Sequence, residues 1–170
     1  VGDEARDEAR YRRELAAESS SGAEVLSTHI HTDGAAGDTL LMPGGGSKTT
    51  PISYESVDKG LHFLKMIEAN KSFKVAVTRF AEACEEAAQV NGYTIDDVDL
   101  IIPHQANIRI IQGMAKKLNV SMDKVYMTIE KYGNISSATV PIALDEAVRT
   151  GTIDKGKLVL LSAFGGGLTW

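Results

Sequence analysis

The sequence contains a single cysteine, Cys84, and no apolar run long enough to cross a membrane. One cysteine cannot build an intrachain disulfide framework, which favours a reducing, cytoplasmic location. The longest apolar runs, such as 158–163, are far shorter than the roughly 20 residues that a bilayer span requires, so no membrane association is expected. The N-terminus is charged where a signal peptide would be apolar, so no secretory signal is expected either.

Positive charge is also scarce, since the 170 residues carry a net charge of −5. This charge disfavours general nucleic-acid binding, although a local basic patch can still bind an acidic partner. No metal site is expected, because His29 and His31 share one face of a predicted strand but lack a third ligand at a recognisable spacing. A hydrophobic fraction of 43% is typical of a globular α/β protein with its own core.

The first 21 residues differ in composition from the rest. The tetrapeptide Asp-Glu-Ala-Arg occurs twice, at residues 3–6 and 7–10. Opposite charges four residues apart support an exposed helix, but an apolar stripe that would dock it is missing. We therefore expect residues 1–21 to be a charged leader, exposed or helical, and residues 22–170 to form the folded domain.

The N-terminal part of that domain predicts two strands and a helix. Alternation of side chains indicates a strand over 25–32, and a short strand is expected at 61–66. Apolar residues at helical spacing predict a helix over 73–90, with Asn91-Gly92 as its C-cap. Cys84 lies on the apolar stripe of this helix, which indicates a buried, inert thiol.

The C-terminal part alternates predicted strands with predicted helices. The strands are expected at 98–102, 125–129 and 157–163, and the helices at 106–118 and 137–149, with Pro141 near the start of the second helix. Apolar strands that alternate with helices predict a layered α/β fold with a largely buried sheet.

Two polar motifs directly follow predicted strands. His104 belongs to Pro-His-Gln-Ala-Asn after 98–102, and Asn134 belongs to Tyr-Gly-Asn after 125–129, where Gly133 permits close backbone approach. Active sites of α/β proteins commonly lie at the carboxyl ends of strands, so these side chains are candidates to bind one thioester carbonyl. The alternatives are a histidine that caps the next helix and an ordinary turn asparagine.

Three glycines follow the last predicted strand, in Phe164-Gly165-Gly166-Gly167. Their backbone N–H groups can face a ligand, as an oxyanion hole requires. A flexible turn explains the same pattern equally well.

The predicted helix 106–118 has two distinct faces. We expect Ile108, Ile111, Ala115 and Leu118 to be buried, and Arg109, Gln112, Gly113 and Lys116 to lie on another face, beside Lys117. Such a cationic face on an acidic protein suggests docking of an acidic partner or a phosphate. A plain solvated helix face remains the alternative.

Together these segments resemble the C-terminal half of β-ketoacyl-acyl carrier protein synthase III, a thiolase-fold condensing enzyme. The resemblance covers roughly residues 22–170, and its matching stretches are 26–34, 73–77, 102–110, 132–138, 141–147 and 163–170. It implies a thiolase-like layered α/β fold with a mixed sheet and packed helices, truncated here at its last strand.

The resemblance also implies an acyltransferase of fatty acid biosynthesis and a role for each candidate residue. In this family an acyl group, usually acetyl from coenzyme A, is loaded on a cysteine, and malonyl-acyl carrier protein loses CO₂ and attacks it. By resemblance, His104 and Asn134 stabilise the enolate, the Gly166 N–H contributes to the oxyanion hole, Phe164 packs beside the cysteine, and Asn107 lies near the pantetheine arm.

By the same resemblance, Arg109, Lys116 and Lys117 bind the acidic carrier protein. The substrates are acyl-coenzyme A and malonyl-acyl carrier protein, with no further cofactor, and the complete protein is a homodimer. The family's nucleophilic cysteine belongs to the N-terminal half and does not match Cys84, so the isolated chain is expected to be inactive.

Two other hypotheses fit the same residues. One is a related thiolase-fold condensing enzyme of another pathway. The other is a non-catalytic fragment that binds a carrier protein through its basic helix face.

Overall fold

The computed structural model describes residues 23–46, 51–67 and 69–170, so the leader expected at 1–21 lies outside the described residues. These residues form two compact units. The first unit combines the segment up to His29 with Ala76–Ala163, and the second combines Ile30–Val75 with Phe164–Trp170. No helix within the described ranges is both long and apolar enough to cross a membrane.

The core of the first unit is a pair of parallel strands. Strands β3 (Leu100–Pro103) and β4 (Val159–Ser162) pair in register from Leu100 opposite Val159 to Pro103 opposite Ser162. All four residues of β3 are buried, as its apolar sequence predicts. Both strands lie where the sequence places them.

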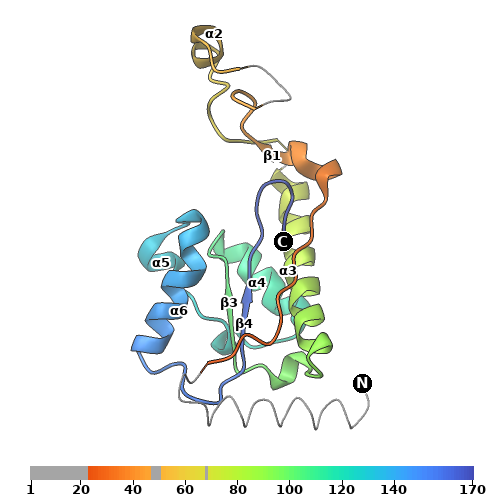
Figure 1. The fold of residues 1–170 in the computed structure, drawn as a ribbon, viewed down its shortest axis with the longest axis vertical. Helices are drawn as coiled ribbons and strands as arrows, with labels where there is room; N and C mark the ends of the chain where they lie inside the picture. Colours follow the sequence, from red (N-terminus) through yellow and green to blue (C-terminus); the bar gives the residue numbers. More distant parts are fainter. Residues whose placement is uncertain (1–22, 47–50, 68) are drawn as a thin grey trace. The chain divides into compact units, whose positions relative to one another are not determined.

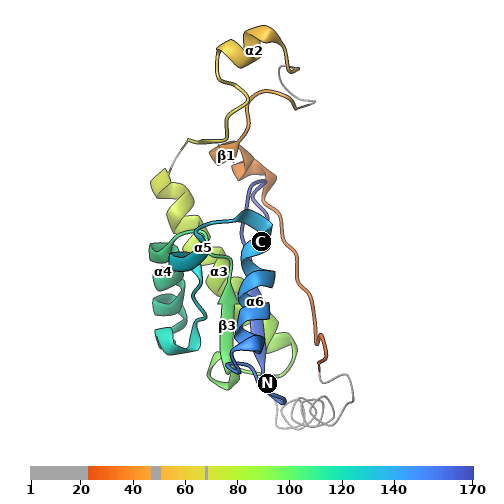
Figure 2. The same ribbon diagram turned by 90° about the vertical axis from the view of Figure 1, so that its left-hand side faces the viewer.

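Helices cover both faces of this strand pair. Figures 1 and 2 show α6 (Thr139–Arg149) on one side, with α3 (Ala69–Val90) and α4 (Ile108–Leu118) on the other. Ala143 and Ala147 of α6 pack against Leu100 and Ile102 of β3 in one buried cluster. The two small residues allow the helix to approach the strand closely, so the first unit is a layered α/β structure.

The C-terminus of α3 confirms the predicted cap. Gly92 has a φ of +76°, and its N–H donates to the Gln89 carbonyl at 3.0 Å. The Tyr93 N–H donates to the Ala88 carbonyl at 2.9 Å. These two bonds form a Schellman motif, which explains why a glycine ends the helix.

Helices α3 and α4 approach each other at Gly113. A Cβ atom added there would lie 2.8 Å from Cγ2 of Val77 on α3. The placement of Gly113 on the cationic face was therefore wrong, because this glycine provides the space into which α3 packs. Ile108 was also misplaced: it is 39% exposed, and Met114 is buried instead.

Short elements complete the two units. The first unit also contains η2 (Ile95–Asp97), η3 (Met122–Lys124), α5 (Ile129–Tyr132) and η4 (Ser136–Ala138). The second unit contains η1 (Gly34–Thr39), β1 (Leu40–Leu41), α2 (Tyr54–Asp58) and β2 (Lys65–Met66).

The strand predicted at 25–32 is wrong: only its end pairs, through a bridge between Thr32 and Thr169, and polar side chains before it bond to α3 and to the residue that follows it. The His29 ring lies 3.2 Å from Glu86 Oε1 and 2.9 Å from Ser27 Oγ, and Asn91 Nδ2 donates to the same Ser27 oxygen at 2.6 Å. Leu26 packs on the cluster that contains Ala88. The alternating pattern thus reflects packing along a helix.

The second unit holds two short antiparallel pairings. Leu40 pairs with Met66 and Leu41 with Lys65, so the strand predicted at 61–66 is confined to its last two residues. His31 exchanges two backbone hydrogen bonds with Trp170, of 2.7 and 2.9 Å, and their rings stack with centroids 5.7 Å apart.

Candidate active site

His104 lies directly after the buried strand β3, as predicted. Its backbone N–H donates to the Ser162 carbonyl at 2.7 Å, which extends the β3–β4 pairing by one bond. The sheet therefore fixes the backbone from which the ring projects. Partial burial lowers the pKa of His104 below its ordinary value of 6.5, because the charged ring loses hydration. The imidazole is consequently neutral at pH 7.

The His104 ring contacts the first residue of α6. Its Nδ1 lies 2.5 Å from Oγ1 of Thr139, a side chain that is 1% exposed. The same hydroxyl lies 2.9 Å from the Ser136 carbonyl oxygen. One buried hydroxyl thus joins the histidine to the loop that carries Asn134.

Asn134 follows the short helix α5 and not a strand. Gly133 before it has a φ of +68°, and no heavy atom lies within 4 Å of the position of an added Cβ. The expectation of close backbone approach at Gly133 was therefore wrong, because the glycine is required by its conformation. Asn134 Oδ1 accepts a 3.0 Å bond from the Ser136 N–H, in a turn where Ser136 has a φ of +55°.

The amide nitrogen of Asn134 remains available to a ligand. Its Nδ2 lies 3.4 Å from the Ala106 carbonyl, two residues beyond His104, which is a long and weak hydrogen bond. The side chain is exposed. A path of polar contacts thus links the two sequence candidates, from Asn134 through Ser136 and Thr139 to His104.

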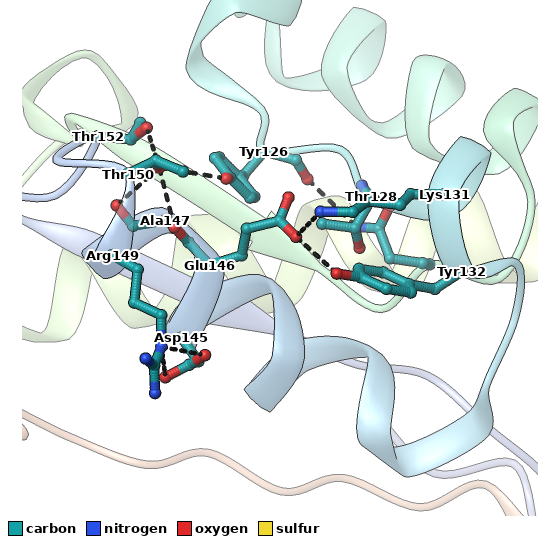
Figure 3. A network of polar contacts seen from close by, with 11 residues as sticks. Tyr126, Thr128, Lys131, Tyr132, Asp145, Glu146, Ala147, Arg149, Thr150 and Thr152 are labelled. Carbon is teal, nitrogen blue, oxygen red and sulfur yellow. Dashed lines mark hydrogen bonds and ion pairs between the residues drawn. The ribbon is translucent and has the colours of Figure 1, made fainter.

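A carboxylate on α6 holds the helix that leads into this loop (Figure 3). Glu146 Oε2 accepts hydrogen bonds from Lys131 Nζ at 2.6 Å and from the Tyr132 hydroxyl at 2.8 Å. The Lys131 bond is the largest of the causes that lower the pKa of Glu146, and the Tyr132 bond is the next. Both donors lie on α5, so the network anchors the residues just before Gly133 and Asn134.

Gln105 explains why the strand predicted at 125–129 does not form. Only Val125 makes a bridge, to Ile101, and the backbone then leaves the sheet. The fully buried Gln105 side chain takes over the pairing: Oε1 accepts from the N–H groups of Thr128 (3.0 Å) and Ile129 (3.1 Å). Its Nε2 donates to the Pro103 carbonyl at 2.8 Å and the Tyr126 carbonyl at 3.2 Å.

Asn107 caps helix α4. Its Oδ1 accepts a 2.8 Å bond from the Arg109 N–H, as expected of an N-cap asparagine. Arg109, Lys116 and Lys117 on this helix are all exposed. Within the described part of the chain none of the three forms an ion pair, so their charges are available to a partner.

Phe164 and Gly166 belong to the second unit. Gly165 and Thr169 exchange backbone bonds of 2.9 and 3.2 Å, and Gly166 lies in the turn between them. Gly166 is exposed, and its N–H bonds to no acceptor among the described residues. The convergence of Gly166 and Phe164 with His104 and Asn134 stays a prediction.

Cys84 does not belong to this site. It is completely buried, and burial raises the pKa of its thiol to about 12, so the thiolate does not form near neutral pH. The prediction that Cys84 is buried is confirmed. No group of three metal-binding side chains comes together in the described ranges.

Sequence reasoning missed Gln105 and Thr139. Gln105 stands beside His104 in a noted motif, but the sequence does not indicate that its amide would be buried and fully bonded. Thr139 had one available signal, its position just before the Val-Pro pair that opens α6. Hydroxyl residues are common at helix starts, so that signal alone does not distinguish a cap from a contact with the site.

Comparison with known proteins identifies relatives of one kind. Residues 88–170 match the family model described as 3-oxoacyl-[acyl-carrier-protein] synthase III C terminal, and β-ketoacyl is a synonym of 3-oxoacyl. A β-ketoacyl-[acyl-carrier-protein] synthase III from Caldanaerobacter subterraneus subsp. tengcongensis is 48% identical over 150 residues, which are 88% of this chain and 45% of the relative.

Solved structures agree with this match. The 3-oxoacyl-[acyl-carrier-protein] synthase III of Aquifex aeolicus VF5 superposes with a TM-score of 0.73 at 37% identity, covering 90% of this chain and 44% of that protein. A priming β-ketosynthase of the R1128 polyketide pathway gives a TM-score of 0.69 at 34% identity, covering 82% of this chain and 41% of that protein.

The chain spans less than half the length of the curated relatives that it matches. The matched part of the relatives is their C-terminal part, where the candidate residues His104, Asn134 and Gly166 lie within 88–170. The chain is therefore similar to the C-terminal part of 3-oxoacyl-[acyl-carrier-protein] synthase III enzymes, and it has their thiolase-like α/β fold.

Proposed function

We propose that this chain supplies the decarboxylation half of a synthase III active site, in a protein that condenses an acyl-coenzyme A with malonyl-acyl carrier protein. The observation that carries the proposal is the path that joins the neutral ring of His104 to Asn134. It runs from the ring to Thr139 Oγ1, from the Thr139 backbone N–H to the Ser136 carbonyl, and from the Ser136 N–H to Asn134 Oδ1. Two neutral donors at one site suit a reaction in which negative charge develops on an oxygen.

The proposed reaction begins at the malonyl thioester. The bond between its α-carbon and its carboxylate breaks, CO₂ leaves, and the electron pair moves to the thioester oxygen to form an enolate. His104 and the Asn134 amide donate hydrogen bonds to that oxygen as the charge grows. Donors held in place before the reaction stabilise the transition state more than the ground state.

The enolate carbon then attacks an acyl group carried as a thioester on a cysteine. Carbon–carbon bond formation generates a tetrahedral oxyanion, which collapses and expels the cysteine thiolate. We assign the Gly166 N–H to this oxyanion and Phe164 to the wall beside the cysteine. The nucleophile lies outside this chain, because Cys84 is buried with a raised pKa.

The test measures CO₂ release from malonyl-acyl carrier protein by the protein in the form that the cell makes. His104→Ala and Asn134→Ala should each lower kcat about 10²–10³-fold, the loss expected for one oxyanion donor. His29→Ala is the matched control, because His29 is also a hydrogen-bonded histidine but lies far from His104 in the sequence. Full activity of both site variants would overturn the proposal.

We propose that the exposed helix face of Arg109, Lys116 and Lys117 binds the acidic carrier protein, and that Asn107 lies near the pantetheine arm. Reversing the three charges to glutamate should raise KM for malonyl-acyl carrier protein and leave turnover of malonyl-coenzyme A unchanged. Lys155→Glu provides the control, since Lys155 is an exposed lysine elsewhere. An unchanged KM would remove the docking assignment.

Similarity to a polyketide priming synthase supports one second candidate, a condensing enzyme of another pathway. Assays with short, branched and long acyl-coenzyme A primers separate the two, since the preferred primer identifies the pathway.

A homodimer and a reducing, cytoplasmic location are part of the proposal that the complete protein is a synthase III. Sedimentation of the complete protein tests the dimer.

A further inference from the structure

The hydroxyl of Thr139 contacts two acceptors but has only one proton. Its Oγ1 lies 2.5 Å from His104 Nδ1 and 2.9 Å from the Ser136 carbonyl oxygen. If the proton points to Ser136, then Nδ1 must carry the histidine proton and donate to Oγ1. If the proton points to His104, then Nδ1 is the acceptor and the ring proton lies on Nε2.

The Ser136 carbonyl does not depend on the hydroxyl. It also accepts a hydrogen bond from the backbone N–H of Thr139. Turning the hydroxyl toward His104 therefore leaves the Ser136 carbonyl with a hydrogen-bond donor. The competing arrangement also gives Nδ1 a partner, because Nδ1–H then donates to Oγ1, but its hydroxyl bond to Ser136 duplicates a donor that this carbonyl already has.

The helix terminus favours the same arrangement. Thr139 is the first residue of α6, an eleven-residue helix whose N-terminus carries partial positive charge. A lone pair on Nδ1 is attracted to that charge, whereas an N–H or a protonated ring is repelled. The ring is neutral at pH 7, so its tautomer decides which atom can donate.

We propose that Thr139 is a positioning residue that donates its hydroxyl proton to Nδ1 of His104 and so holds the ring proton on Nε2. The inference rests on the proposed function and deepens it, because a ring with its proton on Nδ1 presents only a lone pair from Nε2. Such a lone pair repels a developing oxyanion. Thr139 thus selects the tautomer in which His104 acts as a donor, without itself touching the substrate.

The direct test is ¹⁵N NMR of the histidine side chains, recorded above the His104 pKa on the protein as the cell makes it. Nitrogen shifts distinguish a protonated ring nitrogen from an unprotonated one, and the spectrum of His104→Asn identifies the His104 signals. We expect the proton on Nε2 in the unmodified protein. Thr139→Val should move the signals toward a tautomer mixture, and Thr139→Ser should restore them.

The kinetic test compares the same two variants in malonyl decarboxylation. Thr139→Val should lower kcat about three- to tenfold, the factor expected from loss of one ordinary hydrogen bond, with KM unchanged. Thr139→Ser should retain the activity. Thr150→Val is the matched control: the Thr150 hydroxyl donates to a helix carbonyl, that of Glu146 at 2.8 Å, and has no histidine partner.

Two outcomes would overturn the inference: a proton on Nδ1 in the unmodified protein, or an unchanged His104 tautomer in Thr139→Val. If Thr139→Val does not fold, the unmodified protein and Thr139→Ser still decide the tautomer. Failure of the proposed function has a different signature, since His104→Ala would then decarboxylate normally whatever tautomer the NMR spectrum shows.

Discussion

The phenol hydroxyl of Tyr132 on α5 donates a 2.8 Å hydrogen bond to the carboxylate of Glu146 on α6. This bond is one of the causes that lower the pKa of Glu146, after the bond from Lys131. Tyr132→Phe should therefore raise the pKa of Glu146 toward its ordinary value of 4.5, which a ¹³C NMR titration of the carboxyl group measures. The Ser136 amide, which bonds to Asn134, should also exchange its hydrogen several times faster as α5 loosens.

Tyr54→Phe is the control for this change. Tyr54 is 94% exposed in the second unit, so its loss removes a phenol hydroxyl without touching the network. Equal exchange at Ser136 in both variants would show that the Tyr132 bond does not hold the loop.

Replacing Gln105 by leucine should destabilise the protein strongly. The change leaves the buried N–H of Thr128 and its neighbour Ile129 without an acceptor, at about 1–3 kcal/mol for each unsatisfied donor. Urea unfolding measures the loss. Gln112→Leu is the matched control, because Gln112 is exposed on α4 and should change stability by less than about 0.5 kcal/mol. A similar small effect at Gln105 would contradict the pairing role.

Gly113→Ala should destabilise the protein although alanine favours helices. The new Cβ would lie 2.8 Å from Cγ2 of Val77, and overpacking of this kind costs about 1–3 kcal/mol. In a Val77→Ala background the clash disappears, and the same substitution should stabilise the protein by roughly 0.5–1 kcal/mol through helix propensity. Thermal unfolding of the unmodified protein, the two single variants and the double variant gives the coupling, and equal effects in both backgrounds would refute the close approach.

The lowered pKa of His104 makes stability depend on pH. The unfolded chain binds this proton more readily than the folded protein, so protonation favours unfolding. The contribution of His104 is complete above 6.5, the ordinary histidine value, and is lost as the pH falls from there through the lowered pKa. Urea midpoints across this range should decline less steeply in His104→Asn than in the unmodified protein. Parallel curves would contradict the assignment.

Helices could be predicted from sequence because their hydrogen bonds are local. The stripe that contains Cys84 and the Gly92 cap together located α3 within four residues at its start and correctly at its end. The position of His104 at the end of a buried strand was also predicted correctly, since an apolar run followed by a polar motif is a local signal. His104 is placed by β3 alone, because it directly follows the last residue of that strand.

The errors arose where a distant group provides the hydrogen bonds. The pattern at 125–129 is apolar like that of a strand. The acceptor for the N–H groups of Thr128 and Ile129, however, is the side-chain amide of Gln105, more than twenty residues earlier in the sequence. In the same way, the alternation at 25–32 does not reveal that His29 bonds to Glu86 on a helix. The link from Thr139 to His104 spans 35 residues and gives no periodic signal.

The amide of Gln105 also concentrates the sensitivity of this region to mutation at one position. Backbone pairing in a sheet accepts almost any side chain, because each strand presents the same peptide groups to its neighbour. A side chain that must present one carbonyl oxygen and one NH₂ group in a dry interior accepts very few substitutes. Residues 126–129 are therefore relieved of the demands of a strand, whereas Gln105 should resist even the change to glutamate.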